Sequence, residues 1–489
     1  MLYEQYIPGL PATATPPVGA VTRFGYDAVE HRGRRQPPMA RTLSEDDELR
    51  SMQRRMLGTA AADLQRNFAL AAWAIRKHLD YVSTFRFQAR TGNPGFDDAV
   101  ETLVRERSRP AQCDASRRFS LQGLVRLAEC LRTVGGDCGW LRREDGRVQL
   151  IEHDRIATPY DMAVGTLPPG RTANDLVNGV LIGPSGEPLA YAVNKRLRVT
   201  GGMTFERMVP AEFLHLHGYF TRYDQVRGIS PLAAAVNTFR DVYENFDYAL
   251  ARSKIEQLFA FIITRKSAEE FGNVEATVTG GTDGQPERTK YDLKPPKGPI
   301  AMDLDPGDDA KFLSSANPSD QFQSFTAAMI QVGLKALDLP LSFYDESHTN
   351  WVGTRQALMQ YEMGAESKRE GNRQLCDGWT AWQIALALRD GRLALPRGIA
   401  FNDIRWQWIP RNIRWTDPLK EVTANIAAVN AGLKSPQLII QDEGNDAFEM
   451  IDQIAEWQKY VRDAGVTLTS TLPIVPPDAP EDPTNGRRK

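Results

Sequence analysis

The chain is 489 residues long, with 42% hydrophobic and 25% charged residues and a formal net charge of -3. This length exceeds a usual single domain and the composition is that of a globular protein, so we expect two or more folded units. The balance of 59 Lys and Arg against 62 Asp and Glu argues against a protein that wraps nucleic acid tightly, because such binding needs an excess of cations. If DNA is a partner, it is handled without strong adhesion.

The four cysteines are Cys113, Cys130, Cys138 and Cys376, and no pair has the spacing of a zinc or redox motif. The first residues lack the basic and apolar segments of a signal peptide, and no apolar run approaches the ~20 residues of a membrane helix. We therefore expect free thiols, no cofactor or metal, and a soluble protein made in the cytoplasm.

A polar arm and a helical segment open the chain. Residues 1–43 are rich in Pro, Gly and Arg and lack apolar periodicity, which predicts a flexible arm. From Ser44 to about Tyr81 apolar residues recur at helical spacing, and Ser44 followed by Asp47 is typical of a helix start. Helical and strand patterns then mix, which predicts an α+β domain with a helix over 121–131 and strands over 148–153, 190–195 and 212–218.

The middle of the chain predicts two long helices separated by a non-helical excursion. Ser230-Pro231 favours a helix start, and apolar residues then recur to about Ile263, which gives a rod of roughly 50 Å. Residues 265–316 are rich in Gly, Pro and charge, which predicts an exposed excursion. The elements expected next are a helix over 317–337, a loop over 338–353, a helix over 354–388 and a strand over 404–408.

Three capped helices are predicted near the C-terminus. Their start signals are Asp417-Pro418, Ser435-Pro436 and Asp446 with Glu449, and Gly465 ends the last of them. The remaining residues to 489 are Pro-rich and polar, which predicts a disordered tail.

No pattern in the sequence assembles a convincing active site. Phosphate-loop, zinc-protease and nucleophile-elbow motifs are absent, so we expect no enzyme. His215 and His217 would share one strand face, but a third metal ligand is missing and a half-buried strand explains them better. The acidic cluster over 303–309 lacks the glycine and final Glu of a calcium loop, and the tryptophans over 406–415 fit apolar packing better than base stacking.

Over roughly residues 45–465 the chain resembles the portal proteins of lambda-like tailed phages. The most specific stretch lies within 213–262 and has the pattern R-x-x-Q-x-R-G-[IV]-S-P-L, formed here by Arg222, Gln225, Arg227, Gly228, Ile229, Ser230, Pro231 and Leu232. Further similar segments are 64–75, 148–156, 178–193, 317–325, 337–344, 350–358 and 413–439. Asp338 departs from the family, which more often has glycine there, and Val352-Gly353 stand where it more often has serines; both leave the shape of the loop open.

The resemblance implies an α+β portal fold with a wing, long stem helices, a small mixed clip and a helical crown, assembled as a ring. A flexible arm over 1–43 precedes these parts. The implied parts are a wing over 44–230 with 389–416, stem helices over 231–263 and 317–337, a clip over 264–316, a tunnel loop over 338–353, a long wing helix over 354–388, a crown over 417–465 and a disordered tail over 466–489.

The same resemblance implies a function and a set of partners. Such rings, typically of twelve subunits, form the DNA channel at one capsid vertex of the virion; they assemble in the host cytoplasm and serve genome packaging, ejection and tail attachment. The implied partners are further copies of the chain, double-stranded DNA, the terminase large subunit, the major capsid and scaffold proteins, and neck or adaptor proteins, with no membrane.

Two groups of residues are expected to face these partners. In the clip, toward the terminase, they are Glu287, Arg288, Lys290 and Lys294; in the tunnel loop, toward DNA, they are Asp345, Glu346, His348, Thr349, Asn350 and Trp351. The loop contains acidic residues and no Lys or Arg, so a ring of such loops predicts a negative collar around a negative polymer. Weak repulsion there would let DNA slide, whereas cations would hold it.

Two alternatives belong to other classes. A DNA-packaging enzyme such as a nuclease-ATPase would need a phosphate loop or an acidic metal cluster, and the sequence contains neither. Another ring-forming head-tail connector would also be non-enzymatic, but such proteins are usually far smaller and lack the predicted order of helix, excursion and helix.

Overall fold

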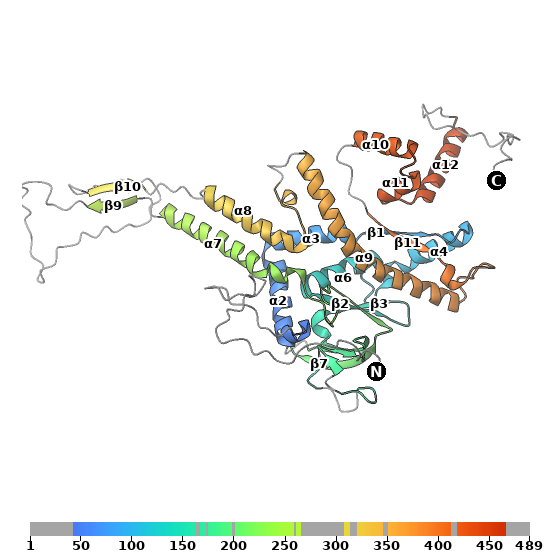
Figure 1. The fold of residues 1–489 in the computed structure, drawn as a ribbon, viewed down its shortest axis with the longest axis horizontal. Coiled ribbons are helices and arrows are strands. Elements are labelled where there is room, and N and C mark those ends of the chain that lie inside the picture. Colours follow the sequence, from blue (N-terminus) through green and yellow to red (C-terminus); the bar gives the residue numbers. More distant parts are fainter. Residues whose placement is uncertain are drawn as a thin grey trace, which may run out of the picture.

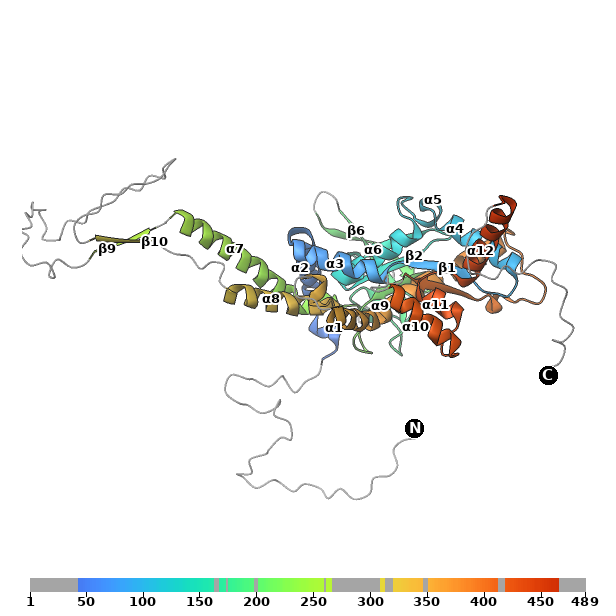
Figure 2. The ribbon, with the colours of Figure 1, turned by 90° about the horizontal axis from the view of Figure 1, so that it is seen from above.

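The computed structural model describes residues 43–161, 167–172, 175–197, 201–258, 261–265, 308–312, 320–345, 351–411 and 418–465. The molecule is elongated: two helices, α7 and α8, project from a mixed body, and three C-terminal helices stand on the body away from them (Figure 1). The view from above shows the same projection (Figure 2).

The helical segment expected from Ser44 to about Tyr81 is confirmed, and it is divided into three helices. They are α1 (Glu45–Glu48), α2 (Ser51–Asn67) and α3 (Ala69–Val82). The breaks fall at Leu49-Arg50 and at Phe68, which has an extended backbone with φ -117° and ψ 108°. Phe68 packs edge-on against Phe239 and Tyr243, with ring centroids 6.2 and 5.4 Å away. Tertiary packing therefore bends a chain whose local pattern is continuous. The predicted cap is confirmed, since the Asp47 amide donates to Ser44 Oγ.

The body contains three small antiparallel sheets. One has the order β3-β2-β8, with β2 (Asp137–Arg142), β3 (Val148–Glu152) and β8 (Leu214–Gly218). A four-stranded sheet is formed by β4 (Leu176–Val177), β5 (Val180–Ile182), β6 (Pro188–Arg196) and β7 (Met203–Pro210). The third pairs β1 (Phe85–Ala89) with β11 (Trp406–Pro410). The strands expected at 148–153, 190–195 and 212–218 are confirmed, and the one expected at 404–408 starts two residues later.

Three further helices complete the body: α4 (Pro94–Arg107), α5 (Pro110–Cys113) and α6 (Leu121–Gly135). The helix predicted over 121–131 is thus confirmed and extends four residues further. Trp406 and Trp408 share one face of β11, because their indole N–H groups donate to Asp377 Oδ1 and Thr380 Oγ1 of the long helix α9 (Trp351–Arg389). Packing rather than base stacking therefore accounts for both; Trp415 lies outside the described residues.

The projecting helices are shorter than the sequence predicts. After a 3-10 turn, η4 (Pro231–Ala234), α7 runs over Val236–Leu258, and β9 (Phe261–Arg265) pairs antiparallel with β10 (Asp308–Phe312). The expectation of helix to Ile263 is therefore wrong. Residues 262–264 are Ile-Ile-Thr, whose β-branched side chains favour strands, and the ladder comes from a segment more than 40 residues away, which helical periodicity cannot reveal.

The return from the projection is also shifted. Helix α8 (Asp320–Leu334) ends in a 3-10 turn, η6 (Lys335–Leu337), and a second 3-10 turn, η7 (Leu341–Phe343), follows. Because α9 begins at Trp351, the expected loop over 338–353 ends earlier and Trp351 belongs to the helix, which contradicts its assignment to the loop. We call α7 and α8 together the strut.

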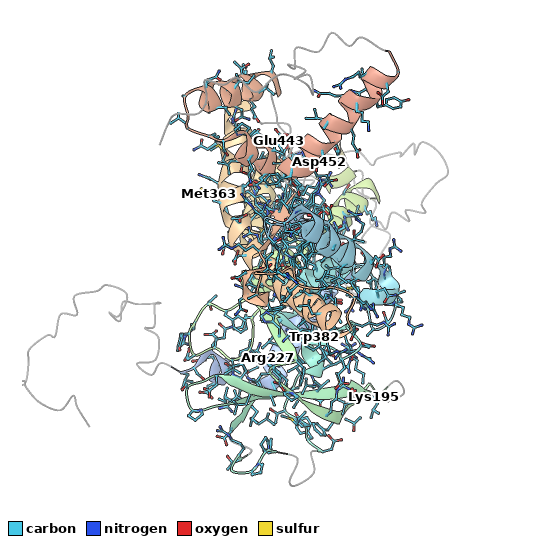
Figure 3. The ribbon with its side chains drawn as sticks, turned by 90° about the vertical axis from the view of Figure 1, so that its right-hand side faces the viewer. Lys195, Arg227, Met363, Trp382, Glu443 and Asp452 are labelled. Carbon is cyan, nitrogen blue, oxygen red and sulfur yellow. The ribbon has the colours of Figure 1, made fainter. Side chains whose placement is uncertain are left out.

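The C-terminal helices begin where the sequence predicts. They are α10 (Pro418–Asn430), α11 (Pro436–Asp442) and α12 (Ala447–Asp463). The Leu438 amide donates to Ser435 Oγ, and the Phe448 and Glu449 amides donate to Asp446 Oδ1, so both caps are confirmed. Figure 3 shows these helices at one end of the molecule, with Glu443 and Asp452 marked, away from Arg227 and Lys195.

Two large apolar cores hold the body together. The first joins α2, α3 and the near ends of α7, α8 and α9; the second surrounds the fully buried Trp379 of α9 and Trp140 of β2. Helix α9 takes part in both and therefore links the strut to the sheets. None of the helices in the described residues is long and apolar enough to span a membrane.

Candidate functional site: the junction beneath the strut

The most specific sequence motif folds into the loop between β8 and η4, at the base of the strut. Arg227 is 1% exposed. Its Nε donates to Asp137 Oδ2 at 2.7 Å and its Nη2 donates to Asp137 Oδ1 at 2.6 Å, so the guanidinium binds this β2 carboxylate in a bidentate manner. Its remaining N–H groups donate to the carbonyls of His153, Asn178 and Ile156. All five guanidinium donors thus have partners, and one side chain ties the loop to both neighbouring sheets.

Two glycines let the loop cross the end of α6. A Cβ added to Gly228 would lie 2.3 Å from the Gly136 carbonyl oxygen, and one added to Gly136 would lie 2.5 Å from that of Gly228. Gly136 also has φ +96°, a conformation that favours glycine. The Gly228 amide donates to Asp137 Oδ2 at 2.8 Å, so the backbone of the loop also helps to position the carboxylate that binds Arg227.

The rest of the motif shapes the loop and starts the strut. The Gln225 amide group accepts from the Thr221 amide and donates to the Arg227 carbonyl, closing the turn from inside. Ser230 Oγ donates to the Thr133 carbonyl of α6 at 2.6 Å and accepts from the Leu232 amide. Ser230 therefore caps η4, whose first residue is Pro231, and anchors it to the body.

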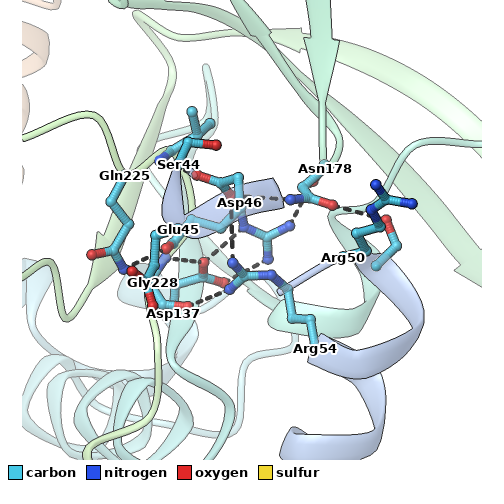
Figure 4. A network of polar contacts seen from close by, with 12 residues as sticks. Ser44, Glu45, Asp46, Arg50, Arg54, Asp137, Asn178, Gln225 and Gly228 are labelled. Atoms are coloured by element: carbon cyan, nitrogen blue, oxygen red, sulfur yellow. Dashed lines mark hydrogen bonds and ion pairs between the residues drawn. The ribbon is translucent and has the colours of Figure 1, made fainter. Parts of the chain in front are cut away.

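The beginning of the described chain closes over the same loop. The Asp46 carboxylate accepts from the Val226 amide at 2.7 Å and from Asn178 Nδ2 at 3.0 Å, and it lies 3.4 Å from Arg54. Figure 4 shows Asp46, Arg54, Asp137 and Asn178 converging from separate elements. Burial, together with the nearby Arg227 cation, lowers the pKa of Arg54 to about 10. The half-exposed Arg222 contacts the carbonyl of Leu43.

A second buried polar cluster lies beside this junction, centred on Glu129 of α6. Its carboxylate accepts from Tyr219 Oη, Arg132 Nε and Asn372 Nδ2, each at 2.7 Å, and from His78 Nε2 at 2.8 Å. Burial alone would raise the pKa of Glu129, but the Arg132 cation and the His78 contact hold it well below its ordinary value. The carboxylate joins α3, α6, α9 and the loop after β8, and we call this group the Glu129 cluster.

The start of the loop between α8 and α9 is fixed by Lys368. Its ammonium donates to the Leu337 carbonyl at 3.1 Å and to Asp338 Oδ2 at 2.7 Å. Asp338 is left-handed, with φ 60°, a backbone conformation that glycine adopts freely and that Asp tolerates better than most residues. Next, Phe343 packs against Tyr81 and Tyr361, with ring centroids 5.5 and 5.3 Å away.

The other predicted site residues are placed as follows. Asp345 is half-buried just after η7, and its amide donates to the Leu341 carbonyl. Glu346, His348, Thr349 and Asn350 lie outside the described residues, as do the clip residues Glu287, Arg288, Lys290 and Lys294. The assignment of these two groups to DNA and to the terminase stays a prediction.

The remaining candidates form no metal site in the described part of the chain. His217 is buried and contacts Asn372 Oδ1 at 3.1 Å, while His215 on the same strand is exposed. Asp308 and Asp309 lie in β10, and the rest of that acidic cluster is outside the described residues. Among the residues described, no group of three or more His, Cys, Asp or Glu side chains could hold a metal ion.

Sequence reasoning missed the partners of the motif. Asp137, Glu129, Arg132 and Lys368 carry most of the polar contacts described above. One signal was available for Glu129, since it lies on the apolar face of α6 with Leu121, Val125 and Ala128. A charged residue in such a place needs a buried partner. Nothing local marks Lys368, whose partner is 30 residues away.

Comparison with known proteins decides the family. The sequence pattern of the phage portal proteins of the lambda family matches residues 32–382, which include the strut, the junction and most of α9. The chain belongs to this family. Residues 383–489, with the three C-terminal helices of this portal protein, lie beyond the matched range.

Solved structures similar to this portal protein come from gene transfer agent (GTA) particles. A chain of the virion of the native particle has 16% identity and a TM-score of 0.44. Chains of the neck, from the empty particle with C6 symmetry and from the native particle with C12 symmetry, have 15% identity and TM-scores of 0.46 and 0.43. Each match covers 79% of this chain and 93% of the other. No curated protein matches the sequence.

Replacing Arg227 by Lys should destabilise this portal protein although the charge is kept. Lysine cannot make the two-pronged contact with Asp137 or reach the three carbonyls, so buried acceptors lose their donors. We expect a loss of about 3 kcal/mol in the free energy of unfolding, measured as a lower urea midpoint. Arg222→Lys, at the half-exposed position of the same motif, is the matched control and should cost no more than about 1 kcal/mol. Equal losses would contradict the role given to Arg227.

The Glu129 cluster should make the fold sensitive to mild acid. Burial lowers the pKa of His78 and, together with Arg132, that of His217. Both rings are therefore neutral when folded but take up protons when unfolded, so stability is fully present above pH ~6.5 and falls as the pH drops below it. Gln at position 78 can still donate an N–H to Glu129 without titrating. Urea unfolding of His78→Gln between pH 7 and 5 should show a shallower loss than the parent, and parallel curves would refute the assignment.

Proposed function

We propose that this portal protein assembles into a ring that forms the DNA channel at one capsid vertex, as a structural and non-enzymatic component of the virion. The observation that carries the proposal is the strut, which leaves the body with large apolar side chains on its surface. The exposed ones are Tyr243, Phe246, Tyr248, Leu250, Phe325 and Val332. A hollow of about 440 Å³ between α7 and α8 is lined by Phe246 and Leu250 together with other apolar residues and with the polar Ser253, Gln323 and Thr326.

Such a strut suits a place between two copies of itself. A pair of projecting helices buries one face along their mutual contact, and the other faces need covering. Twelve helices about 10 Å across, standing side by side, would form a circle of roughly 38 Å between opposite helix centres. The bore would be about 28 Å, slightly wider than a duplex. The 23-residue α7 would give this part of the wall a height of roughly 35 Å.

The finer assignments follow the order of elements. The body would be the wing, the strut the stem, and residues 264–316 the clip, which would meet the terminase during packaging and neck proteins afterwards. The loop from Asp338 to Asn350 would face DNA, and the C-terminal helices would form the crown. Lys368 and the aromatic contacts of Phe343 support a fixed starting direction for the loop. The capsid and scaffold proteins would surround the wing.

Electron microscopy tests the ring directly. Negatively stained preparations of the purified protein should contain annular particles with an axial hole. Leu250→Asp with Phe325→Asp places charge on the strut surface and should lower the annular fraction at least tenfold. Asn237→Asp, an exposed polar position of α7, is the matched control and should leave the fraction unchanged. Parent protein that stays monomeric at all concentrations would refute the ring.

Reversing the loop charge tests the channel. Asp345→Lys with Glu346→Lys would convert a repulsive collar into cations that hold phosphates, and each phosphate contact adds affinity. Packaging by assembled particles should slow, most strongly at low salt, where counterion release is largest. Equal packaging rates for the parent and the double variant at every salt concentration would contradict the repulsive collar.

A further inference from the structure

The three C-terminal helices lack a core within one chain. Of residues 419–465, only Asp446 and Ala447 are buried. The same stretch carries large hydrophobic side chains that are 39–80% exposed, namely Leu419, Val422, Ile426, Leu433, Leu438, Phe448, Ile451, Ile454, Trp457 and Tyr460. The body of the protein shows the opposite distribution, with two large apolar cores.

Most of the stability of a helix in a protein comes from the packing of its apolar face. The three C-terminal helices contain 13, 7 and 17 residues, and isolated helices are marginal below about 12–15 residues even for favourable sequences. Within the described residues, ion pairs connect them to the body at Glu449 with Arg86 and at Glu421 with Arg355, the latter at 3.6 Å. Exposed pairs of this kind contribute about 0–1 kcal/mol each, so they cannot replace a core.

The uncovered side chains form two faces on different helices. On α10, Leu419, Val422 and Ile426 are spaced by three and four residues and so lie on one side. On α12, Phe448, Ile451 and Ile454 form a second face, continued by Trp457. Together the exposed apolar side chains present on the order of 1,000 Å² per copy; divided between two contacts this is roughly 500 Å² per partner at each, less than the ~800 Å² of a self-sufficient interface, so the contact adds to a ring that is also joined elsewhere.

We propose that the crown is completed between copies, with the α10 face of one chain packing on the α12 face of the next. This inference rests on the proposed ring and identifies the C-terminal helices as a place where neighbouring copies contact one another. A ring subunit has a neighbour on each side and meets them through two different surfaces, which is what two separate apolar faces provide. Each copy would thus supply the missing core of its neighbour.

The charge of these helices argues against DNA as the occupant. Residues 418–465 contain eight acidic and four basic residues, whereas surfaces that bind nucleic acid are strongly positive. The apolar faces are also the kind of surface that forms the centre of protein interfaces. A second copy offers a complementary face in a fixed position, because it carries the same two helices.

Hydrogen exchange on purified rings tests the proposal. In parent rings, amides of α10 and α12 should exchange at least tenfold more slowly than in Ile451→Asp/Ile454→Asp rings. Both side chains are exposed in the single chain and belong to neither of its two large apolar cores, so the substitutions leave the packing of the body intact. In the variant rings, amide exchange should be faster on α10 as well as on α12, although α10 carries no substitution. Gln453→Asp, on the polar face of α12, is the matched control and should behave as the parent.

The outcomes separate this inference from the proposed function. Rings that form while crown exchange is the same in parent and variant would overturn the crown contact and leave the channel proposal standing. A variant that fails to form rings under conditions in which Gln453→Asp forms them would also support the contact. Parent protein without rings would refute both proposals.

Discussion

The arrangement of this portal protein depends on one buried ion pair, between Arg227 and Asp137. It sits where two sheets, the end of α6 and the first turn of the strut meet. A buried ion pair adds little net stability, because the removal of both charges from water costs free energy that offsets their attraction. Its value is geometric: a guanidinium with five satisfied donors admits one orientation of the loop. The direction of the strut follows from that orientation.

The polar contacts continue from this pair toward the loop between α8 and α9. Ser230 at the base of the strut donates to the Thr133 carbonyl, and the Thr133 hydroxyl donates to the Glu129 carboxylate at 3.3 Å. Arg132 of the same cluster donates to the Lys368 carbonyl, and the Lys368 ammonium holds Asp338 at the start of the loop. The start of α7 and the end of α8, which both lie at the base of the strut, are thus connected to one network of polar contacts inside the body. In the proposed ring the loop would have to keep a constant position, and a network of this kind would hold it.

The body and the C-terminal helices represent two ways of stabilising a chain. The body buries Trp140, Trp379 and two clusters of aliphatic residues, and it could hold its shape as a single copy. The C-terminal helices keep their apolar residues on the surface, and the strut shares this property in part. In the proposed ring the stability of these parts depends on neighbouring copies and therefore on protein concentration.

Much of the local structure could be read from the sequence. The caps at Ser44, Ser230, Ser435 and Asp446 are local chemistry, since a side-chain oxygen meets an amide two or three residues away. The strands of the body follow from alternation and turns, and the motif from Arg222 to Pro231 identified the family. By contrast, the break at Phe68 and the end of α7 at Leu258 were not predictable, because aromatic packing and strand pairing with distant segments decide them.

The site shows the same division. The sequence by itself determined that Arg227, Gly228 and Ser230 belong to one special loop, because their order along the chain is the signal. Only the tertiary structure decided that Arg227 is held by Asp137, that Gly228 crosses Gly136, and that Lys368 fixes Asp338. These partners are 30 to 92 residues apart in the chain. A buried charge requires a partner, but its identity is set by which elements fold against one another, and that information is not local.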